Sequence, residues 1–599
     1  MIESYHWIDH SGVITSSYMK RPSRLVIVAV LLTFAVVFTA LTVSSYVRES
    51  ATVDEPQHLT AGYIALKLSD YHVDAEHPPF LRMWAALPLL MMQQINLDTD
   101  SVNWLPMKPE YFSHEFLYLK NNADRLLYPA RFMIVLLGIL LGGILFCWAQ
   151  KLYGFWPAVI VLALYTTEPN ILAHARLVTT DFGITCFMFA TLYFVWRTTR
   201  ELTLKNLSGL IVFCALAQVS KFSALILWPI MFVLLLVHVL RGNTWLCRIG
   251  PQRELTSRIR KMLAAACIGV LLLLASFTAI WAVYGFRYSP APEGSRLLKL
   301  VNKPVVLERV PRLAKVMNWI NDHHLLPNAC TQGFLLSQGL SQKRAAFLAG
   351  RVSDTGWWYY FPVVFLIKTP ISTLVLLFGG TLLALFKRKV FMGDDSFMLA
   401  PVVVYLLIAM TSHLNIGLRH ILPIYPFVLL IAGRAVAWLW ENQQKMLRAW
   451  LLALCLFQID ETAFVYPHYL AFFNQFIGGP RNGYKWLADS NIDWGQDLKP
   501  LKKWMDHHDI KAVNLSYFGH ADPAYYGIKC SYPPPVPFFA EGRDDGLRLP
   551  GYVAVSVQNL RGLSVDPPRP DLYKKLLESE PVAVIGYSIH VYWVDRPWW

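Results

Sequence analysis

The chain has 599 residues, of which 55% are hydrophobic and only 16% are charged. Its mean hydropathy is +0.38, and several uninterrupted apolar runs are long enough to cross the core of a bilayer. This composition excludes a water-soluble globular protein and predicts a polytopic helical membrane protein. The formal net charge of +14 is interpreted as a topology signal with some attraction to anionic lipid head groups, and it does not indicate nucleic-acid binding.

The first apolar run, residues 25–45, is longer than the core of a signal peptide and has no clear small-residue cleavage site. We therefore interpret it as an uncleaved anchor. Hydropathy and periodicity predict about eleven spans. The expected spans are 25–46, 127–149, 156–174, 178–196, 207–220, 223–240, 262–284, 363–386, 397–412, 420–440 and 450–467.

The basic residues predict the orientation of these spans, because Lys and Arg gather in cytoplasmic loops. All their clusters fall on the N-terminal side, so the N-terminus is expected in the cytoplasm and the C-terminus outside. The clusters are Lys20, Arg21 and Arg24; Lys151; Arg197, Arg200 and Lys205; Arg241, Arg248, Arg253, Arg258, Arg260 and Lys261; Lys387, Arg388 and Lys389; and Lys445 and Arg448.

Three large segments are left on the external face: residues 47–126, 285–362 and 468–599. The last segment contains strand-like stretches at 512–519, 551–560 and 581–594, and helical stretches near 497–507 and 570–579. These patterns predict two domains, a membrane domain over 1–467 and a small soluble α/β domain over 468–599.

The eight cysteines form no CxxC pair and show no Cys/His metal-binding spacing. Only Cys330 and Cys530 fall in the predicted external segments. Because that face is oxidising, a disulfide between them is one alternative, and two unpaired thiols are the other.

The first external segment, residues 52–80, combines polar and ionisable groups beside a membrane span. Thr52 and Glu55 fit a helix capping box, but a cap leaves Asp54 and His58, which lie four apart on one helical face, without a role. The later stretch Glu76-His77-Pro78-Pro79 is typical of a turn in which proline opens a new helix. A working site and two structural turns are therefore both open.

The same residues resemble glycosyltransferase family 39, which contains the protein O-mannosyltransferases and the lipid A aminoarabinose transferase. An Asp-Glu pair follows the first span, and an acidic residue with His-Pro-Pro follows some twenty residues later. Arg176 and Asp181 in HARLVTTD match the family's spacing. Arg131 and Lys221 stand where that family has basic residues. Later segments, among them Gly350 to Pro370 and His413 to Pro426, resemble a bacterial branch whose acceptor is not known.

The resemblance implies a fold of the GT-C type in a bacterial inner membrane. It also implies an inverting transfer of a sugar from a polyprenyl-phosphate donor to a hydroxyl of a protein, lipid or glycan acceptor. A phosphate leaving group needs no protonation, so one carboxylate base suffices. We predict Asp54 as that base, with a pKa above its usual value because it lies at the edge of the apolar layer. Glu55 and Asp181 are placed with it in the catalytic group.

The departing phosphate needs positive charge or other hydrogen-bond donors nearby. The predicted donor-binding residues are His58, His77, Arg131, Arg176, Lys221, Arg419 and His420. The structural alternative is that the cations snorkel or pair between helices, and for Arg176 it is an ion pair with Asp181. The aminoarabinose transferase has lysine where His77 stands, so that contact is not carried over. Its equivalent of Glu76 binds a metal, which makes a divalent ion at Glu76 an open alternative.

Residues 489–498, DSNIDWGQDL, begin like a calcium-binding loop, but Gly495 is one place late and Pro500 stands where a glutamate is required. An Asx-rich turn that caps the helix after Asp497 is predicted instead. Two other functional classes stay open: a transporter of a lipid-linked sugar and a membrane-anchored glycan-binding protein. A transporter is expected to have ionisable groups near the midplane and repeated halves, whereas here the ionisable groups gather at one face.

Overall fold

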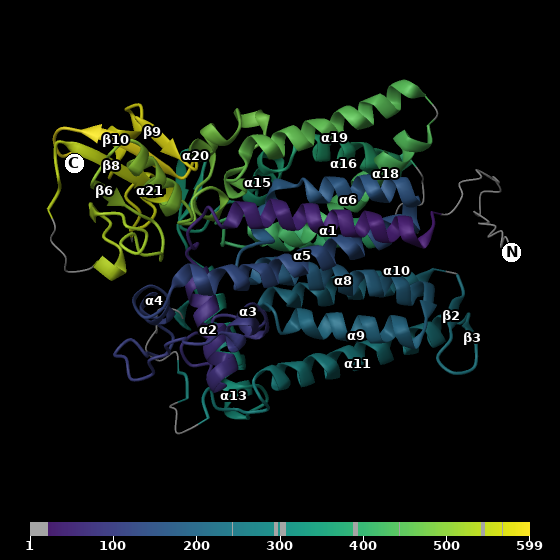
Figure 1. Cartoon of the computed structure of the whole chain (residues 1–599). Helices are drawn as coiled ribbons and strands as arrows, with labels where there is room; N and C mark the ends of the chain where they lie inside the picture. Colours follow the sequence, from purple (N-terminus) through teal and green to yellow (C-terminus); the bar gives the residue numbers. More distant parts are fainter. Residues whose placement is uncertain are drawn as a thin grey trace.

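The computed structural model describes residues 22–241, 243–292, 297–299, 307–386, 393–442, 444–540, 546–565 and 567–598. Its long helices run side by side (Figure 1). They are α1 (Arg24–Tyr46), α5 (Ala123–Tyr153), α6 (Phe155–Thr166), α8 (Thr180–Arg200), α9 (Leu204–Gln218), α10 (Leu227–Leu240), α11 (Arg258–Val283), α16 (Ile371–Phe386), α18 (Tyr425–Glu441) and α19 (Lys445–Val465). The helix α17 (Ser396–Met410) contacts α10 and α18.

Five helices of the described chain are long and apolar enough to cross a membrane: Arg24–Tyr46, Ala123–Tyr153, Phe222–Leu240, Arg258–Val283 and Leu418–Glu441. A sixth candidate is the pair α15 (Tyr360–Lys368) and α16, which is bent by 115°. The chain is therefore a multi-pass membrane protein. Each of the eleven expected spans overlaps a helix, but several of these helices are short or less apolar, so the number eleven stays a prediction.

The helix α5 lies at the centre of the bundle, where it contacts α1, α6, α8 and α18. It begins at Asn122, whose side chain accepts a hydrogen bond from the Arg125 backbone, and it ends at Gly154 with φ of 85°. Gly138 and Gly142 face α1, and a Cβ at these positions would lie 2.5 and 2.3 Å from the rings of Phe38 and Phe34. Small residues thus let the two helices approach closely, as is typical of membrane helices.

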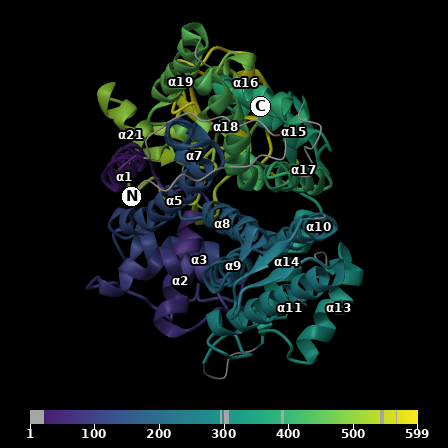
Figure 2. The same cartoon turned by 90° about the vertical axis from the view of Figure 1, so that its right-hand side faces the viewer.

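Viewed along the helices, the chain forms two groups (Figure 2). The helices α15 to α19 lie in the upper half of this view, α9 and α11 lie in the lower half, and α5 and α8 lie between them. The helix α8 is buried almost completely, since it has protein on both sides, and it has buried residues all round. Polar residues on such a helix therefore need partners inside the protein.

The three segments predicted to be external gather at one end of the bundle, on the left in Figure 1. They contribute α2 (Glu55–Leu68), α3 (Phe80–Ala86), α4 (Pro109–His114), α13 (Pro311–Asp322), α14 (Asn328–Ser341) and the C-terminal sheet. The opposite end carries β1 (Glu201–Leu202), β2 (Trp245–Cys247) and β3 (Arg253–Leu255), which form a small sheet within a basic region. Lys20, Arg21 and Lys387 to Lys389 lie outside the described residues.

The C-terminal segment forms a five-stranded mixed sheet of order β7-β6-β8-β10-β9. In chain order the elements are α20 (Gly483–Trp486), α21 (Leu498–His507), β6 (Val513–Ser516), β7 (Cys530–Ser531), β8 (Gly551–Ser556), α22 (Val557–Leu560), α23 (Lys574–Leu577), β9 (Ala583–Ile585) and β10 (Ile589–Val594). The strand β6 is parallel to β7 and β8, whereas β10 is antiparallel to β8 and β9. The stretch 581–594, predicted as one strand, is a hairpin.

The two faces of this sheet have different partners. Leu515, Ala554 and Val591 belong to the same hydrophobic core as the membrane helices, whereas Val553 and Tyr592 form a small separate core on the other face. The sheet is thus packed onto the helical part rather than joined to it by a free linker, and the division at residue 467 stays a prediction.

The structure decides one open alternative and corrects one local prediction. No disulfide joins Cys330 to Cys530, which agrees with the alternative of two unpaired thiols. The side chain of Asp497 does not cap α21; it accepts a hydrogen bond from Ser588 at 2.6 Å and forms an ion pair with His468 at 3.2 Å instead. Residues 489–498 join the two parts of the molecule, since Ser50 and Val53 donate backbone hydrogen bonds to the carbonyls of Gln496 and Trp494.

Candidate functional site

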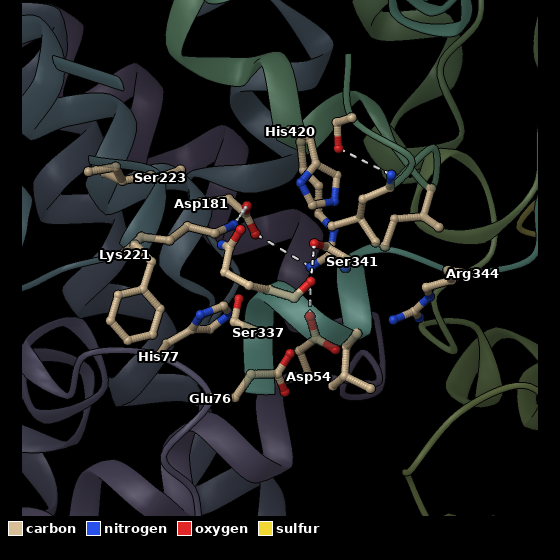
Figure 3. A pocket seen from close by; sticks show the side chains of 18 of the residues that line it. Asp54, Glu76, His77, Asp181, Lys221, Ser223, Ser337, Ser341, Arg344 and His420 are labelled. Carbon is tan, nitrogen blue, oxygen red and sulfur yellow. Dashed lines mark hydrogen bonds and ion pairs between the residues drawn. The ribbon is translucent and has the colours of Figure 1, made fainter. Parts of the chain in front are cut away.

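A cavity of about 660 Å³ opens at the end of the bundle where the three external segments meet (Figure 3). Its walls come from α2, the start of α8, α14, the turn before α18 and the loop after β6. The polar lining residues are Asp54, Gln57, His58, Glu76, His77, Asp181, Lys221, Ser223, Ser337, Gln338, Ser341, Arg344, Arg419, His420 and His520. Residues far apart in the chain therefore converge on one space.

A chain of ion pairs crosses this cavity. Arg419 Nη1 lies 2.6 Å from Asp54 Oδ2 and 3.5 Å from Asp181 Oδ2, and Lys221 Nζ lies 2.5 Å from Asp181 Oδ1. Dashed lines in Figure 3 mark this sequence of contacts. Two carboxylates and two cations thus alternate across the site, and Arg344 lies beside them as a third cation.

Each of these charged groups sits at an end of a helix. Asp54 precedes the first residue of α2, and Asp181 lies in the first turn of α8. Arg419 lies in the 3-10 turn 418–424 that leads into α18, and its guanidinium stacks over the Trp494 ring at 4.3 Å. Helix ends place polar groups at the edge of the apolar layer, where they can be solvated or bind a ligand.

The prediction that Asp54 is more basic than usual is wrong for this state of the protein. Burial raises the pKa of its carboxyl. The charges of Arg419 and His58 and the hydrogen bond from Arg419 lower that pKa by more than burial raises it, so the pKa lies below its usual value. Glu76, which forms no ion pair with a described residue, is different: burial and the nearby Asp74 and Asp54 carboxylates raise its pKa.

Two histidines face the cavity with one ring nitrogen unused. The rings of His58 and His77 meet edge to face at 5.7 Å, and Nδ1 of each is buried without a hydrogen-bond partner among the described residues. The same holds for Nε2 of His420. Burial and the positive charge of Arg82 lower the pKa of His58 to about 4, so its imidazole is neutral near pH 7. Buried polar atoms of this kind are available for a ligand.

Apolar side chains also line the cavity, and we refer to them together as its apolar wall. Among them are Phe222, Leu225, Ile226, Leu340, Phe361, Ile408, Ala409, Leu414 and Pro423. Several of them belong to the membrane-length helices and the turns that lead into them. The cavity is therefore amphipathic, since charged and apolar side chains line the same space.

Three predicted site residues do not reach the cavity. Glu55 is fully buried, where Arg131 donates to its two carboxylate oxygens at 2.8 and 2.6 Å, and it also accepts hydrogen bonds from the backbones of Thr52 and Val178. The hydrogen bond from the Thr52 backbone to Glu55 is part of the capping box predicted from the sequence. Arg176 forms two hydrogen bonds with Glu49, at 2.6 and 3.0 Å.

None of Glu55, Arg131 and Arg176 lines the cavity, and we refer to these residues together with Glu49 as the scaffold. A catalytic or phosphate-binding role for them stays a prediction. The predicted alternative, an ion pair between Arg176 and Asp181, does not form either, because Asp181 pairs with Lys221 and Arg419. The other predicted residues, His58, His77 and His420 among them, do line the cavity.

The residues do not support a metal site made by the protein alone. Within the described ranges no three His, Cys, Asp or Glu side chains are grouped so as to hold a metal ion. Glu76 and His77 both line the cavity, but two adjacent ligands are fewer than such a site needs. No step below depends on a metal.

Sequence reasoning missed two sets of lining residues. Ser337 and Ser341 lie one turn apart on α14 with Arg344 just beyond, a polar face that helical spacing in residues 328–344 could have indicated. Phe518 and His520 come from the loop after β6, and Gln57 and His520 are joined by a hydrogen bond of 2.9 Å. No local pattern predicts that long-range contact.

Residues 106–281 match the family model described as dolichyl-phosphate-mannose-protein mannosyltransferase. The matched segment contains Arg131, Arg176, Asp181 and Lys221, whereas Asp54, Glu76 and Arg419 lie outside it. It covers less than half of the chain. No curated protein matches the sequence.

Similar solved structures are distant. The Saccharomyces cerevisiae protein O-mannosyltransferase Pmt1-Pmt2 complex bound to the sugar donor has 16% identity and a TM-score of 0.32, with 43% of this chain and 33% of that chain covered. ArnT from Cupriavidus metallidurans bound to undecaprenyl phosphate has 12% identity and a TM-score of 0.31, with 95% and 98% covered. An Archaeoglobus fulgidus oligosaccharyltransferase tethered with an acceptor peptide has 9% identity and a TM-score of 0.48, with 90% and 70% covered.

The chain thus spans about a third of the yeast protein, and TM-scores this low do not transfer a function. The family-model match confirms the resemblance predicted from the sequence motifs. The chain is a multi-pass membrane protein that carries, in residues 106–281, the sequence pattern of the dolichyl-phosphate-mannose-protein mannosyltransferase family.

Proposed function

We propose that this protein is an inverting glycosyltransferase of the GT-C type that moves a sugar from a polyprenyl-phosphate donor to an acceptor hydroxyl. The observation that carries the proposal is the single amphipathic cavity in which a carboxylate, three cations and an apolar wall meet. A lipid-linked sugar phosphate has the same three parts: a hydrocarbon chain, an anionic phosphate and a polar sugar.

The cations suit the leaving group. Lys221, Arg344 and Arg419 lie on the same cavity, and each can donate charge-assisted hydrogen bonds to phosphate oxygens. His58, His77 and His420 add ring nitrogens that have no partner among the described residues. Donors held in place before the reaction stabilise the charge that develops on the phosphate as the glycosidic bond breaks.

Asp54 is proposed as the base, and its ion pair with Arg419 suggests when it becomes active. In the free protein the pair holds the carboxylate in a weakly basic state. A donor phosphate competes for the Arg419 guanidinium, which weakens its hold on Asp54 and raises the basicity of the carboxylate.

The acceptor oxygen then attacks the anomeric carbon while its proton moves to Asp54. The bond between that carbon and the phosphate oxygen breaks, and the phosphate leaves as an anion with the bonding electron pair. A single displacement of this kind inverts the configuration of the sugar carbon, and the lipid phosphate is the second product.

We propose that the lipid chain lies along the apolar wall and that the acceptor lies near Gln57, Phe518 and His520. The orientation of the spans favours an active site on the external face of a bacterial inner membrane, with the N-terminus in the cytoplasm. Residues 468–599 are proposed as an external domain that completes the cavity of the membrane domain 1–467. The sugar and the acceptor, whether protein, lipid or glycan, are left to the experiment.

The test uses membrane vesicles that contain the full chain and a panel of isotopically labelled undecaprenyl-phosphate sugars, with mannose first because of the family match. We expect one donor to be consumed, with undecaprenyl phosphate released and label transferred to vesicle material. Vesicles without the protein set the background. Consumption of no member of the panel, or movement of an intact donor across the membrane without release of undecaprenyl phosphate, contradicts the proposal and favours a transporter.

A further inference from the structure

A second cavity, of about 700 Å³, lies where the C-terminal sheet meets the segment that follows α19. It shares no lining residue with the first cavity. Its walls come from residues 468–484 on one side and from the β9–β10 hairpin on the other. Figure 1 shows α20 beside β9 at this junction.

The lining of the second cavity combines basic and aromatic side chains. Arg481 and His468 supply positive charge or hydrogen-bond donors, and Tyr484, Tyr587 and His590 supply rings. No aspartate or glutamate belongs to the described lining. This chemistry favours an anion that carries polar groups, because Arg binds phosphate with two donors at once and tyrosine offers both a ring face and a hydroxyl.

The hairpin side of the cavity is held in place by a buried carboxylate. Ser588 and His468 both contact Asp497, at 2.6 and 3.2 Å. Gly586 has φ of 55°, and a Cβ there would lie 2.2 Å from the Asp497 carboxylate, so the turn of the hairpin needs a glycine to approach it. Burial lowers the pKa of His468, but the Asp497 carboxylate raises it by more, so the pKa of His468 lies above its usual value.

Side chains on the opposite wall of the second cavity are also held in place by contacts within the protein. Arg561 donates a hydrogen bond from Nε to the Tyr484 carbonyl at 2.9 Å and stacks on the Tyr484 ring at 5.1 Å. The His590 ring meets Tyr484 edge to face at 4.6 Å. These contacts fix the orientation of Tyr484 toward the cavity, so binding a ligand costs little ordering of this side chain.

Two exposed apolar side chains belong to the lining of the second cavity. Val582 and Val584 line it and are 56% and 43% exposed. In neighbouring parts of the sequence, Phe464, near the end of α19, and Phe476, in the segment that leads to Arg481, are 67% and 64% exposed. Exposed phenylalanines and valines at the end of an expected membrane span are typical of contact with lipid. The basic cavity therefore opens at the level where lipid head groups lie.

We propose that this second cavity binds the phosphate-bearing head group of a membrane lipid, with Arg481 on the phosphate, Tyr484 and Tyr587 beside the head group and the two valines on its acyl chains. The site goes beyond the proposed transferase function and involves neither Asp54 nor Arg419. Lipid binding in the second cavity would hold the C-terminal sheet against the bilayer, next to the part of the protein that forms the first cavity.

The test measures lipid binding by the purified full chain with native mass spectrometry. The probe is dihexanoyl phosphatidic acid below its critical micelle concentration, with dihexanoyl glycerol and inorganic phosphate as comparators. Arg481→Ala is the test variant. Lys503→Ala is the matched control, because Lys503 is an exposed lysine of the same C-terminal segment that does not line the cavity.

We expect Arg481→Ala to weaken one phosphatidic acid binding event about tenfold, because a charge-assisted contact is lost, and Lys503→Ala to leave it unchanged. Tyr587→Ala should weaken the same event. The first cavity is common to all variants, so their difference reports the second cavity alone. Equal binding by Arg481→Ala and Lys503→Ala overturns the proposal. Binding of dihexanoyl glycerol or of inorganic phosphate as tight as that of phosphatidic acid overturns the assignment to a lipid phosphate. A loss of transferase activity has no bearing on this result.

Discussion

Two sets of ion pairs lie within the same end of the molecule, and they differ in what surrounds them. In the scaffold, Glu55 with Arg131 and Glu49 with Arg176 are fully buried, and Glu55 is further satisfied by backbone hydrogen bonds. In the cavity, Asp54, Arg419, Asp181 and Lys221 pair with one another beside open space.

The difference teaches that charge at the edge of a membrane does not by itself mark a catalytic group. We expect a fully buried pair that does not line the cavity to support the fold, because a ligand cannot reach it. A pair that faces a cavity can exchange its partner for a ligand, because the ligand replaces the lost contact. The following variants test this distinction.

The largest effect is expected at Asp54. We predict that Asp54→Asn lowers the rate of sugar transfer about 100- to 10,000-fold, the range of a lost general base, without loss of folded protein. The measurement is donor consumption in proteoliposomes. Asp100→Asn is the matched control, because Asp100 is an exposed aspartate of the same external segment. A variant with nearly normal transfer would remove Asp54 from the mechanism.

In the scaffold the same kind of change should act on stability. Glu55→Gln leaves the Arg131 guanidinium buried without its counter-charge, so we predict a loss of about 3–5 kcal/mol in the free energy of unfolding. Detergent-induced unfolding followed by circular dichroism measures it. Donor affinity of the protein that stays folded should be unchanged; full stability together with lost donor binding would return Glu55 to the active site.

Lys221 is expected to show a smaller effect on the donor. Lys221→Met removes one charged contact to the phosphate, so we predict a roughly tenfold weaker donor affinity. Lys120→Met is the control, because Lys120 is a half-exposed lysine that pairs with Asp98 on the surface. If both variants bind the donor equally well, Lys221 serves only as the partner of Asp181.

The pH dependence gives the smallest and most specific effect. Arg419 holds the pKa of Asp54 below its usual value of about 4. The carboxylate therefore stays ionised as the pH falls, and kcat/KM should not decrease until the pH is below about 4. Removing the guanidinium leaves burial as the main influence, which raises the pKa. Arg419→Gln should therefore move the acidic limb of kcat/KM to higher pH, whatever its effect on the maximum. An unmoved limb would show that Asp54 is not the titrating group.

Local patterns in the sequence predicted much of this fold. Long apolar runs predict the helices, and clusters of basic residues distinguish the two ends of the bundle. Both patterns depend on composition alone. The alternation of apolar residues predicts β6 and β8 but not β7, and it extends β8 over residues 557–560, which form α22. It also predicts 581–594 as one strand, because the turn at Gly586 depends on a contact with Asp497.

The site was predicted only in part, for a physical reason. Asp54, Lys221 and Arg419 are polar residues at the edge of an apolar run, and Asp181 is predicted from its place in the family motif. Glu55 has the same local signal as Asp54, and only its contact with Arg131, 76 residues away, shows that its carboxylate is paired inside the protein. The ion pair that lowers the pKa of Asp54 joins residues 365 positions apart, so no local pattern could have corrected that prediction.

The most direct test of the account is mass spectrometry of the lipids that remain bound to the purified protein. We compare Asp54→Asn with the double variant Lys221→Met/Arg419→Gln, with both proteins checked for the same unfolding midpoint. The account predicts that Asp54→Asn retains a polyprenyl-phosphate sugar, since its phosphate contacts are intact, and that the double variant retains none. If the two proteins retain the same amount of this lipid, or if neither holds any when it is supplied, the cavity does not bind the donor phosphate.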